Sequence, residues 1–111
     1  MQTINTPPWL TEPCPSWCVV LHEQRDQPSD RRHVSASLAV PVTQLRGVGE
    51  SEAPEGDQER AAELMLCLHR LVGSRTTWLY AGDGRHQGLE LSTDSWSLVA
   101  PALDRLLAAD V

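Results

Sequence analysis

Between His33 and Leu45 the chain alternates between apolar residues and polar or small ones. With a period of two, every second side chain points to the same face, so this stretch predicts a half-buried β-strand. Pro41 lies within the stretch, and because proline has no amide proton it indicates an edge position or a bulge. The apolar positions are Val34, Ala36, Leu38, Val40 and Val42.

The segment 60–72 fits two patterns. Its leucine, alanine, methionine and glutamate residues favour a helix, as does an apolar face at helical spacing. Every second residue in its middle is also a leucine, as one face of a strand requires: Leu64, Leu66 and Leu68. The turn residues 73–74 and the β-rich run 76–80 follow directly, an order typical of a hairpin. We therefore expect a strand here, with a helix as the alternative.

A helix is expected at the C-terminal end, after another short strand at 88–92. Ser92 or Thr93 is a suitable N-cap, and the apolar residues beyond it recur every three to four positions. They are Trp96, Val99, Leu103, Leu106 and Leu107. Pro101 lies inside this helix and predicts a kink or a broken first turn. Together the elements predict an α+β fold: a small antiparallel sheet of three to four strands with the C-terminal helix packed on one face.

The proline-rich N-terminal residues 1–12 predict a flexible arm, and residues 13–111 predict a single domain. Two polar stretches within the domain, 25–32 and 47–59, are typical of loops. The second holds five acidic residues and no basic one, which indicates a solvated segment.

Four potential metal ligands lie close together in the sequence: Cys14, Cys18, His22 and His33. Two thiolates and two imidazoles are a usual donor set of a structural zinc site, in which protein groups fill the whole tetrahedron. A short helix beginning at Pro15 would place Cys18 and His22 one turn apart on the same side. Cys14 would bend back over the first turn. We therefore expect a structural zinc ion that clamps this helix to His33 at the start of the strand.

The same residues allow other interpretations. Cys14 and Cys18 could be ordinary small residues, with both histidines on a polar surface. They could also form a disulfide, strained because their side chains would be nearly parallel. If His33 did not bind, three ligands and one water would remain, and Glu23 would be the nearest candidate base of a small metal-dependent hydrolase or redox protein. Four protein ligands leave no open position, so a non-enzymatic role is preferred.

The motif C-P-S-W-C at residues 14–18, followed by His22 and His33, resembles the opening of a family of small uncharacterised actinobacterial proteins. Members show C-P-x-W-C, a nearby histidine, a polar loop and a second histidine followed by a small residue. A few strands and a helix rich in leucine and alanine come next, and the segment from Leu91 onward is similar to that ending. The resemblance spans most of residues 13–109. It implies a sheet with one packed helix, favours a strand over 62–71 and carries no assigned activity.

Charge argues against one class of partner. The chain of 111 residues has a net charge of −6, with nine arginines, no lysine and acidic excess in both halves. Nucleic-acid binding draws most of its affinity from neutralised phosphates and needs a basic surface, so we expect no nucleic-acid partner. No apolar run approaches the ~18 residues that cross a bilayer, so we expect no membrane span.

The N-terminal residues have neither a basic start nor an apolar stretch, so we expect no secretory signal. Together with an odd number of cysteines, three, this indicates a reducing compartment and hence the cytoplasm. The sequence therefore predicts a zinc-stabilised interaction or regulatory module. An unknown protein partner would meet an exposed sheet edge or the acidic loop 49–59, and a homodimer could form through strand edges.

Overall fold

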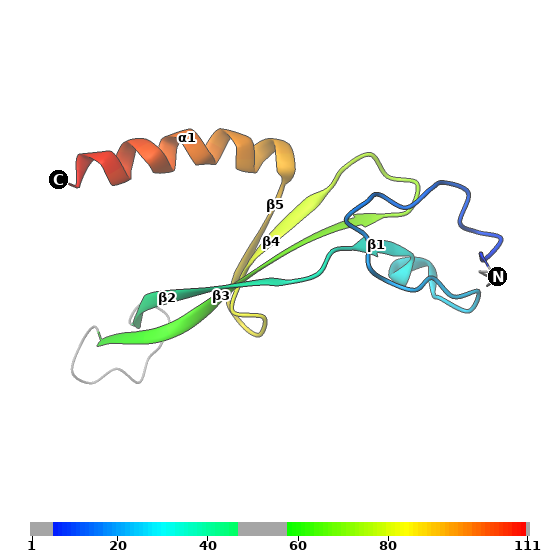
Figure 1. Cartoon of the computed structure of the whole chain (residues 1–111), viewed down its shortest axis with the longest axis horizontal. Coiled ribbons are helices and arrows are strands. Elements are labelled where there is room, and N and C mark those ends of the chain that lie inside the picture. The colour runs from blue at the N-terminus through cyan, green and yellow to red at the C-terminus, as the bar shows by residue number, and fades with distance from the viewer. Residues whose placement is uncertain (1–5, 47–57, 111) are drawn as a thin grey trace.

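The computed structural model describes residues 6–46 and 58–110, and within them it forms an open antiparallel sheet of five strands followed by one helix (Figure 1). The strands are β1 (Arg32–Val34), β2 (Leu38–Arg46), β3 (Gln58–Leu71), β4 (Trp78–Gly82) and β5 (Gly88–Ser92), and the helix is α1 (Thr93–Ala109). A 3-10 turn, η1 (Pro28–Asp30), precedes β1. The arm predicted over 1–12 and the loop predicted over 47–59 fall partly outside the described residues.

β3 is the long central strand, so the strand predicted for this segment is confirmed and the helix alternative is wrong. β1 and β2 pair in turn with one edge of β3, and β4 pairs with the other edge. Pairing on both edges explains the outcome, because backbone hydrogen bonds and cross-strand contacts override the helix propensity of leucine and alanine. The short strand predicted at 88–92 is also confirmed as β5.

The single strand predicted from 33 to 45 is in fact two strands, and the sheet has five strands instead of three to four. Ser35 lies in the interruption between β1 and β2. Its backbone N–H donates to the carbonyl of Leu68 at 2.9 Å, and its hydroxyl accepts from the N–H of Leu68 at 2.8 Å. The side chain thus takes a place that a backbone carbonyl has in a regular ladder, and the strand breaks there.

The short helix predicted from Pro15 is wrong, because this part of the chain forms a turn. The N–H of Cys18 donates to the carbonyl of Pro15 at 3.0 Å, which closes a single turn. Directly afterwards Cys18 forms an antiparallel bridge with Ser35, and the N–H of Val19 donates to the carbonyl of Val34 at 2.9 Å. Pairing with the β1 edge therefore takes up the amide groups that a continuing helix would need.

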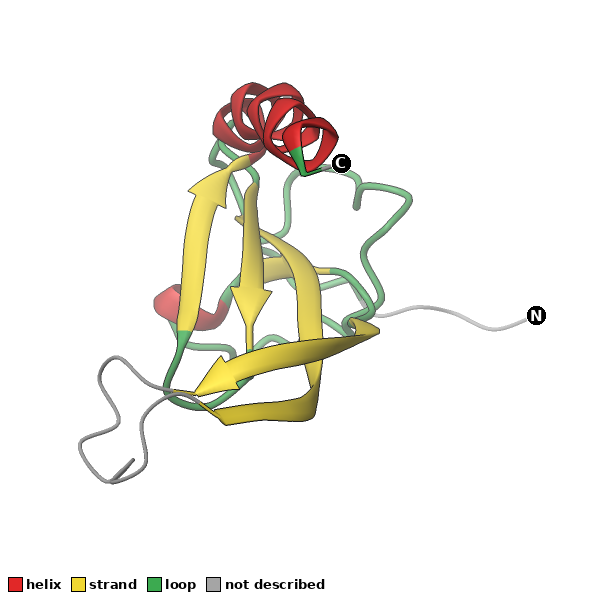
Figure 2. Ribbon diagram, turned by 90° about the vertical axis from the view of Figure 1, so that its left-hand side faces the viewer, coloured by secondary structure: helices red, strands yellow, loops and turns green. Residues whose placement is uncertain are grey.

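α1 begins as predicted, since the hydroxyl of Ser92 accepts from the N–H of Ser95 at 3.1 Å. We predicted a kink or a broken first turn at Pro101; the helix is continuous from Thr93 through Pro101, so its first turn is not broken. Its attachment to the sheet lies at its start, where the indole N–H of Trp96 donates to the carbonyl of Leu79 at 2.9 Å. The rest of α1 extends away from β4 and β5 (Figures 1 and 2). The predicted packing of the helix on one face of the sheet is therefore confined to the first turns of α1.

One face of the sheet is apolar, and we call it the apolar face. Register and alternation place these residues on it: Leu38, Val40, Val42, Ala62, Leu64, Leu66, Leu68, Leu79, Ala81, Leu89 and Leu91. Across the described ranges, however, no alanine, valine, leucine, methionine, tryptophan or tyrosine side chain is buried. In the same part of the chain, no helix has the length and apolar character that crossing a bilayer requires.

Candidate metal centre

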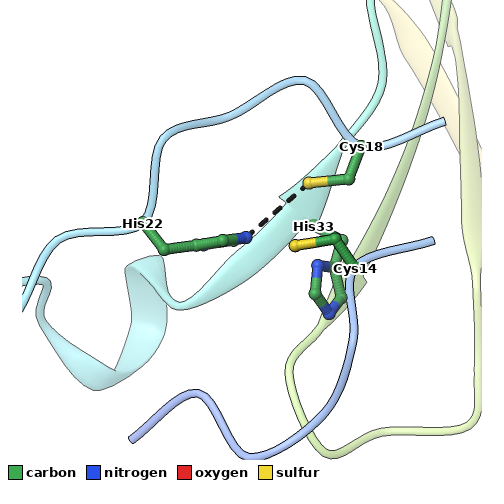
Figure 3. Close-up of side chains that lie close together, drawn as sticks. All are labelled: Cys14, Cys18, His22 and His33. Atoms are coloured by element: carbon green, nitrogen blue, oxygen red, sulfur yellow. Dashed lines mark hydrogen bonds between the residues drawn. The ribbon is translucent and has the colours of Figure 1, made fainter. Parts of the chain in front are cut away.

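The four predicted ligands come together at the end of the molecule where the N-terminal segment crosses β1 (Figure 3). One donor atom from each of Cys14, Cys18, His22 and His33 lies within 4.8 Å of the others. Cys18 Sγ is 3.7 Å from His22 Nε2. Over residues 6–46 and 58–110 this is the one group of three or more Cys, His, Asp or Glu residues with such geometry.

Each ligand is positioned by backbone structure. Cys14 and Cys18 flank the turn at Pro15, and the bridge to Ser35 fixes Cys18 beside β1. His33 is the middle residue of β1, opposite Arg70 on β3. The chain therefore brings two thiols from a turn to the side chain of a sheet residue.

His22 reaches the same point from the loop after this bridge. Its ring meets the His33 ring edge to face, with 5.2 Å between centroids and 89° between planes. On its other side His22 meets Trp9 at 5.6 Å, also edge to face. Contacts between aromatic rings thus help to orient the two imidazoles.

Burial affects the protonation of His22 and Cys14. His33 is fully buried and His22 is 9% exposed. Burial, and then the proximity of His33, lowers the pKa of His22, which favours the neutral imidazole that binds metal. Cys14 is exposed as a whole, but desolvation of its sulfur raises the pKa of its thiol, and neighbouring Cys18 adds to this. A bound cation would favour the thiolate form of Cys14.

Glu12 determines which nitrogen of His33 faces the cluster. The carboxylate oxygen Oε2 lies 2.7 Å from His33 Nε2, and this hydrogen bond lowers the pKa of Glu12. Glu12 is itself fixed, because its Oε1 accepts from the N–H of Gly73 at 3.0 Å and Arg70 Nη2 lies 4.0 Å from Oε2. With its proton on Nε2, His33 keeps a lone pair on Nδ1.

That Nδ1 atom is buried and has no hydrogen-bond partner among the described residues. One ring nitrogen of His33 faces the sulfur atoms in Figure 3. Because Nε2 is bonded to Glu12, the facing nitrogen is Nδ1. A buried acceptor without a partner is costly, and a metal bond would satisfy it. A carboxylate behind the histidine is also the usual second partner of a metal-bound imidazole.

Two tryptophans and two arginines surround the cluster. Trp17 meets the His33 ring at 6.4 Å, and the guanidinium of Arg70 lies 5.8 Å from the Trp17 ring. Likewise Arg31 lies 5.0 Å from the ring of Trp9, the neighbour of His22. The cationic groups lie against the aromatic faces that are attractive to them.

Sequence reasoning missed Glu12, which it placed in a flexible arm. Nothing in the sequence distinguishes this residue from the other acids, because its role depends on meeting His33 and Gly73 in space. The predicted base Glu23 is exposed, and its hydrogen bonds to Trp9 and Asp26 run through its backbone. All three cysteines, including Cys67 on β3, are free thiols, so the structure holds no Cys14–Cys18 disulfide.

A second histidine group lies elsewhere on the sheet. His69 Nε2 is 2.6 Å from Glu90 Oε1, and its Nδ1 is 3.3 Å from Arg32 Nη1. Neighbouring Cys67 lies within hydrogen-bond reach of Ser35. Both ring nitrogens of His69 are therefore taken by side chains, in contrast to those of His33.

The fold and the cluster define a small α+β protein with a Cys2His2 group that could hold a metal ion. The chain belongs to a family described as a domain of unknown function (DUF6907), whose model matches residues 1–109. This confirms the expectation of an uncharacterised family to which no activity is assigned. Comparison with curated proteins and with solved structures gave no match in either case.

Proposed function

We propose that Cys14, Cys18, His22 and His33 hold a structural zinc ion, and that the protein is a non-enzymatic module built around it. The observation that carries this proposal is the buried, unpartnered Nδ1 of His33. Glu12 orients the ring so that this atom is an acceptor, and the nearest donors of the other three residues surround the same point. Two sulfurs and two nitrogens are a donor set that favours zinc over harder cations.

The spacing of the donor atoms supports this choice. Bond lengths of ~2.0–2.3 Å place the ligand atoms of tetrahedral zinc roughly 3.3–3.8 Å apart. The distance from Cys18 Sγ to His22 Nε2 is 3.7 Å, and the upper limit for all pairs is 4.8 Å. Movements of the ligand atoms by about an ångström or less would bring all four to zinc-binding distances.

A structural role is favoured over a hydrolytic one. A catalytic zinc site has three protein ligands and keeps a position open for water, whereas this group offers four. Glu23, the base that a hydrolase would need, is exposed and outside the group. The ion would instead fasten the N-terminal segment to β1 and β3.

Such an ion would add to the contacts of Glu12 and Cys18 that hold the N-terminal segment to the sheet. Structural zinc sites contribute apparent free energies of roughly 10–16 kcal/mol in small domains. The module would act in the reducing cytoplasm, where thiols persist, through protein contacts.

Metal analysis of the purified full-length protein tests this function. We expect about one zinc per chain in the wild type, and loss of zinc in Cys18→Ser. Cys67→Ser is the matched control, because Cys67 is a free thiol on β3 outside the cluster. It should keep its zinc.

A second measurement does not depend on the folding of a variant. Cobalt(II) added to metal-free wild-type protein should give the absorption of a tetrahedral site with thiolate ligands. Absence of that spectrum, or zinc retained after substitution of both Cys14 and Cys18, would contradict the proposal.

A further inference from the structure

The chain has two large apolar surfaces that do not cover each other. The first is the apolar face of the sheet, where Leu38 is 64% exposed and Leu89 is 53% exposed. The second is the apolar stripe of α1, where Leu103 is 51% exposed and Leu107 is 63% exposed. Apolar groups of this size are normally removed from water on folding, and here they are not.

The geometry of α1 explains why the two surfaces remain open. Leu103 lies seven residues after Trp96 and therefore on the same side of the helix, the side that Trp96 turns toward the sheet. Beyond its first turns, however, α1 extends away from β4 and β5. In Figure 1 it runs in the same direction as the ends of β2 and β3, with the helix above and the strands below.

A hollow of about 290 Å³ opens on the apolar face. Its apolar lining includes Val42 on β2, Leu64 on β3, Ala81 on β4 and Leu89 on β5, and polar residues also line it: Thr43, Gln44, Glu63, Asp83 and Gln87. It therefore lies across four strands, on the part of the face that α1 leaves open. A ridge of apolar side chains from another helix would fit such a surface.

We propose that a second copy of this chain covers these surfaces, so that the protein is an intertwined homodimer. The stripe of α1 from each copy would pack on the apolar face of the other. A two-fold axis makes such a contact twice, because each copy offers both the helix and the face that receives it. This interface uses sheet faces and helices, unlike the strand-edge dimer that the sequence suggested.

The exposed area agrees with this arrangement. A compact monomer of 12.3 kDa exposes about 6,100 Å², whereas this chain exposes 8833 Å². The excess of about 2,700 Å² per chain is more than the ~800 Å² per partner of a standard stable interface. Its radius of gyration is 18.5 Å, against roughly 13 Å for a compact domain of this length.

One further feature favours a second copy over a different protein. The described residues include no buried hydrophobic core, so the chain needs a partner in order to fold, and another copy is always present at the same concentration. The net charge of −6 on each copy opposes self-association, so the contact has to lie on uncharged surface. The residues that define the apolar face are leucine, valine and alanine.

Sedimentation equilibrium of the zinc-loaded, full-length protein tests the proposal. We expect about 24.6 kDa, twice the chain mass of 12.3 kDa. Leu103→Asp should weaken association at least ~10-fold, since it puts a charge in the middle of the stripe. The matched control is Leu98→Asp, because Leu98 is 77% exposed and lies on the opposite side of α1 from Trp96. It should remain dimeric.

If Leu103→Asp fails to fold, thermal melts of the wild type at several protein concentrations still test the proposal. The thermal midpoint of an obligate dimer rises with protein concentration, whereas that of a monomer does not. A folded 12.3 kDa species with a constant midpoint would overturn the proposal, as would equal dissociation of both variants. So would a chain that is soluble only with a different protein. Zinc content per chain, measured on the same samples, keeps this result separate from the metal proposal.

Discussion

His33 Nε2 lies 2.7 Å from Glu12 Oε2, and this contact orients the only fully buried large side chain among the described residues toward the cysteines. Glu12 is tied to the end of β3 through the N–H of Gly73. The carboxylate therefore connects the N-terminal segment, β1 and the turn after β3. Substitution of Glu12 should therefore lower the zinc affinity more than it lowers the stability of the fold.

Glu12→Gln should weaken zinc binding about 10–100-fold, the usual effect of removing a carboxylate behind a metal-bound histidine. The amide keeps an oxygen for the N–H of Gly73 but loses the negative charge that holds the proton on His33 Nε2. Competition with a chelator measures the change. Glu23→Gln is the control, because Glu23 is exposed and next to His22 in sequence. Equal zinc affinities of the two variants would show that Glu12 does not support the metal site.

His33→Ala and His69→Ala should differ in metal content. His33 has a free buried Nδ1, whereas both nitrogens of His69 have side-chain partners, Glu90 and Arg32. His33→Ala should lower zinc affinity at least ~100-fold, and His69→Ala should keep about one zinc per chain. Metal analysis after dialysis measures both. Zinc lost equally from both variants would show that the assignment of ligands is wrong.

Asp83 should make stability depend on acid pH. Its Oδ1 accepts from the N–H groups of Arg85, Gln87 and His86 at 2.8–3.0 Å, and these bonds, that of Arg85 first, lower the pKa of Asp83. A carboxylate with a lowered folded pKa stabilises the fold above its unfolded pKa, and this contribution is lost as pH falls through the folded value.

Asp83→Asn should therefore melt below the wild type at pH 7, and the difference should shrink as pH falls below the ordinary aspartate value of about 3.9. Thermal melts of both proteins from pH 7 to pH 2.5 measure it. Asp104→Asn, on the exposed surface of α1, is the control and should show no such trend. A difference that stays constant with pH would mean that the charge is not involved.

Gly88→Ala should destabilise the β4–β5 pair. Gly88 pairs with Gly82, and the ring of Tyr80 lies against Gly88, so a Cβ there would collide with the ring. A Cβ on Gly82 would instead meet the Tyr80 hydroxyl and the backbone of Gln87. The ring is held in place because the Tyr80 hydroxyl donates to the carbonyl of Gln87 at 3.2 Å and accepts from the N–H of Gly84 at 2.8 Å. Overpacking of this kind costs roughly 1–3 kcal/mol in the free energy of unfolding.

A double-mutant cycle in denaturant checks this cause. In a Tyr80→Ala background the ring is gone, so Gly88→Ala should cost clearly less than it does in the wild type. The same cost in both backgrounds would place the effect in the backbone of β5 and not in the ring contact.

The local sequence pattern predicted which residues form the candidate metal site, but not the backbone structure that carries them. The spacing of Cys14, Cys18, His22 and His33 was enough to identify the cluster, because only these four offer thiolate or imidazole donors between residues 14 and 33. The local structure that carries them was predicted wrongly. The turn at Pro15 replaces a helix because the next residues pair with β1, and pairing partners are invisible to a local pattern.

The sequence alone determined the elements whose signals are local: the strand at 88–92, the cap at Ser92 and the helix after it. Capping and side-chain periodicity act within a few residues, so they can be recognised without a fold. The tertiary structure decided that 58–71 is a strand, that Glu12 supports His33, and that α1 leaves the apolar face open. These outcomes depend on contacts between segments far apart in the chain. The local pattern of 60–72 fitted both a strand and a helix, and only pairing on both edges of β3 decides between them. For Glu12 and for the open apolar face, no local pattern carries a signal.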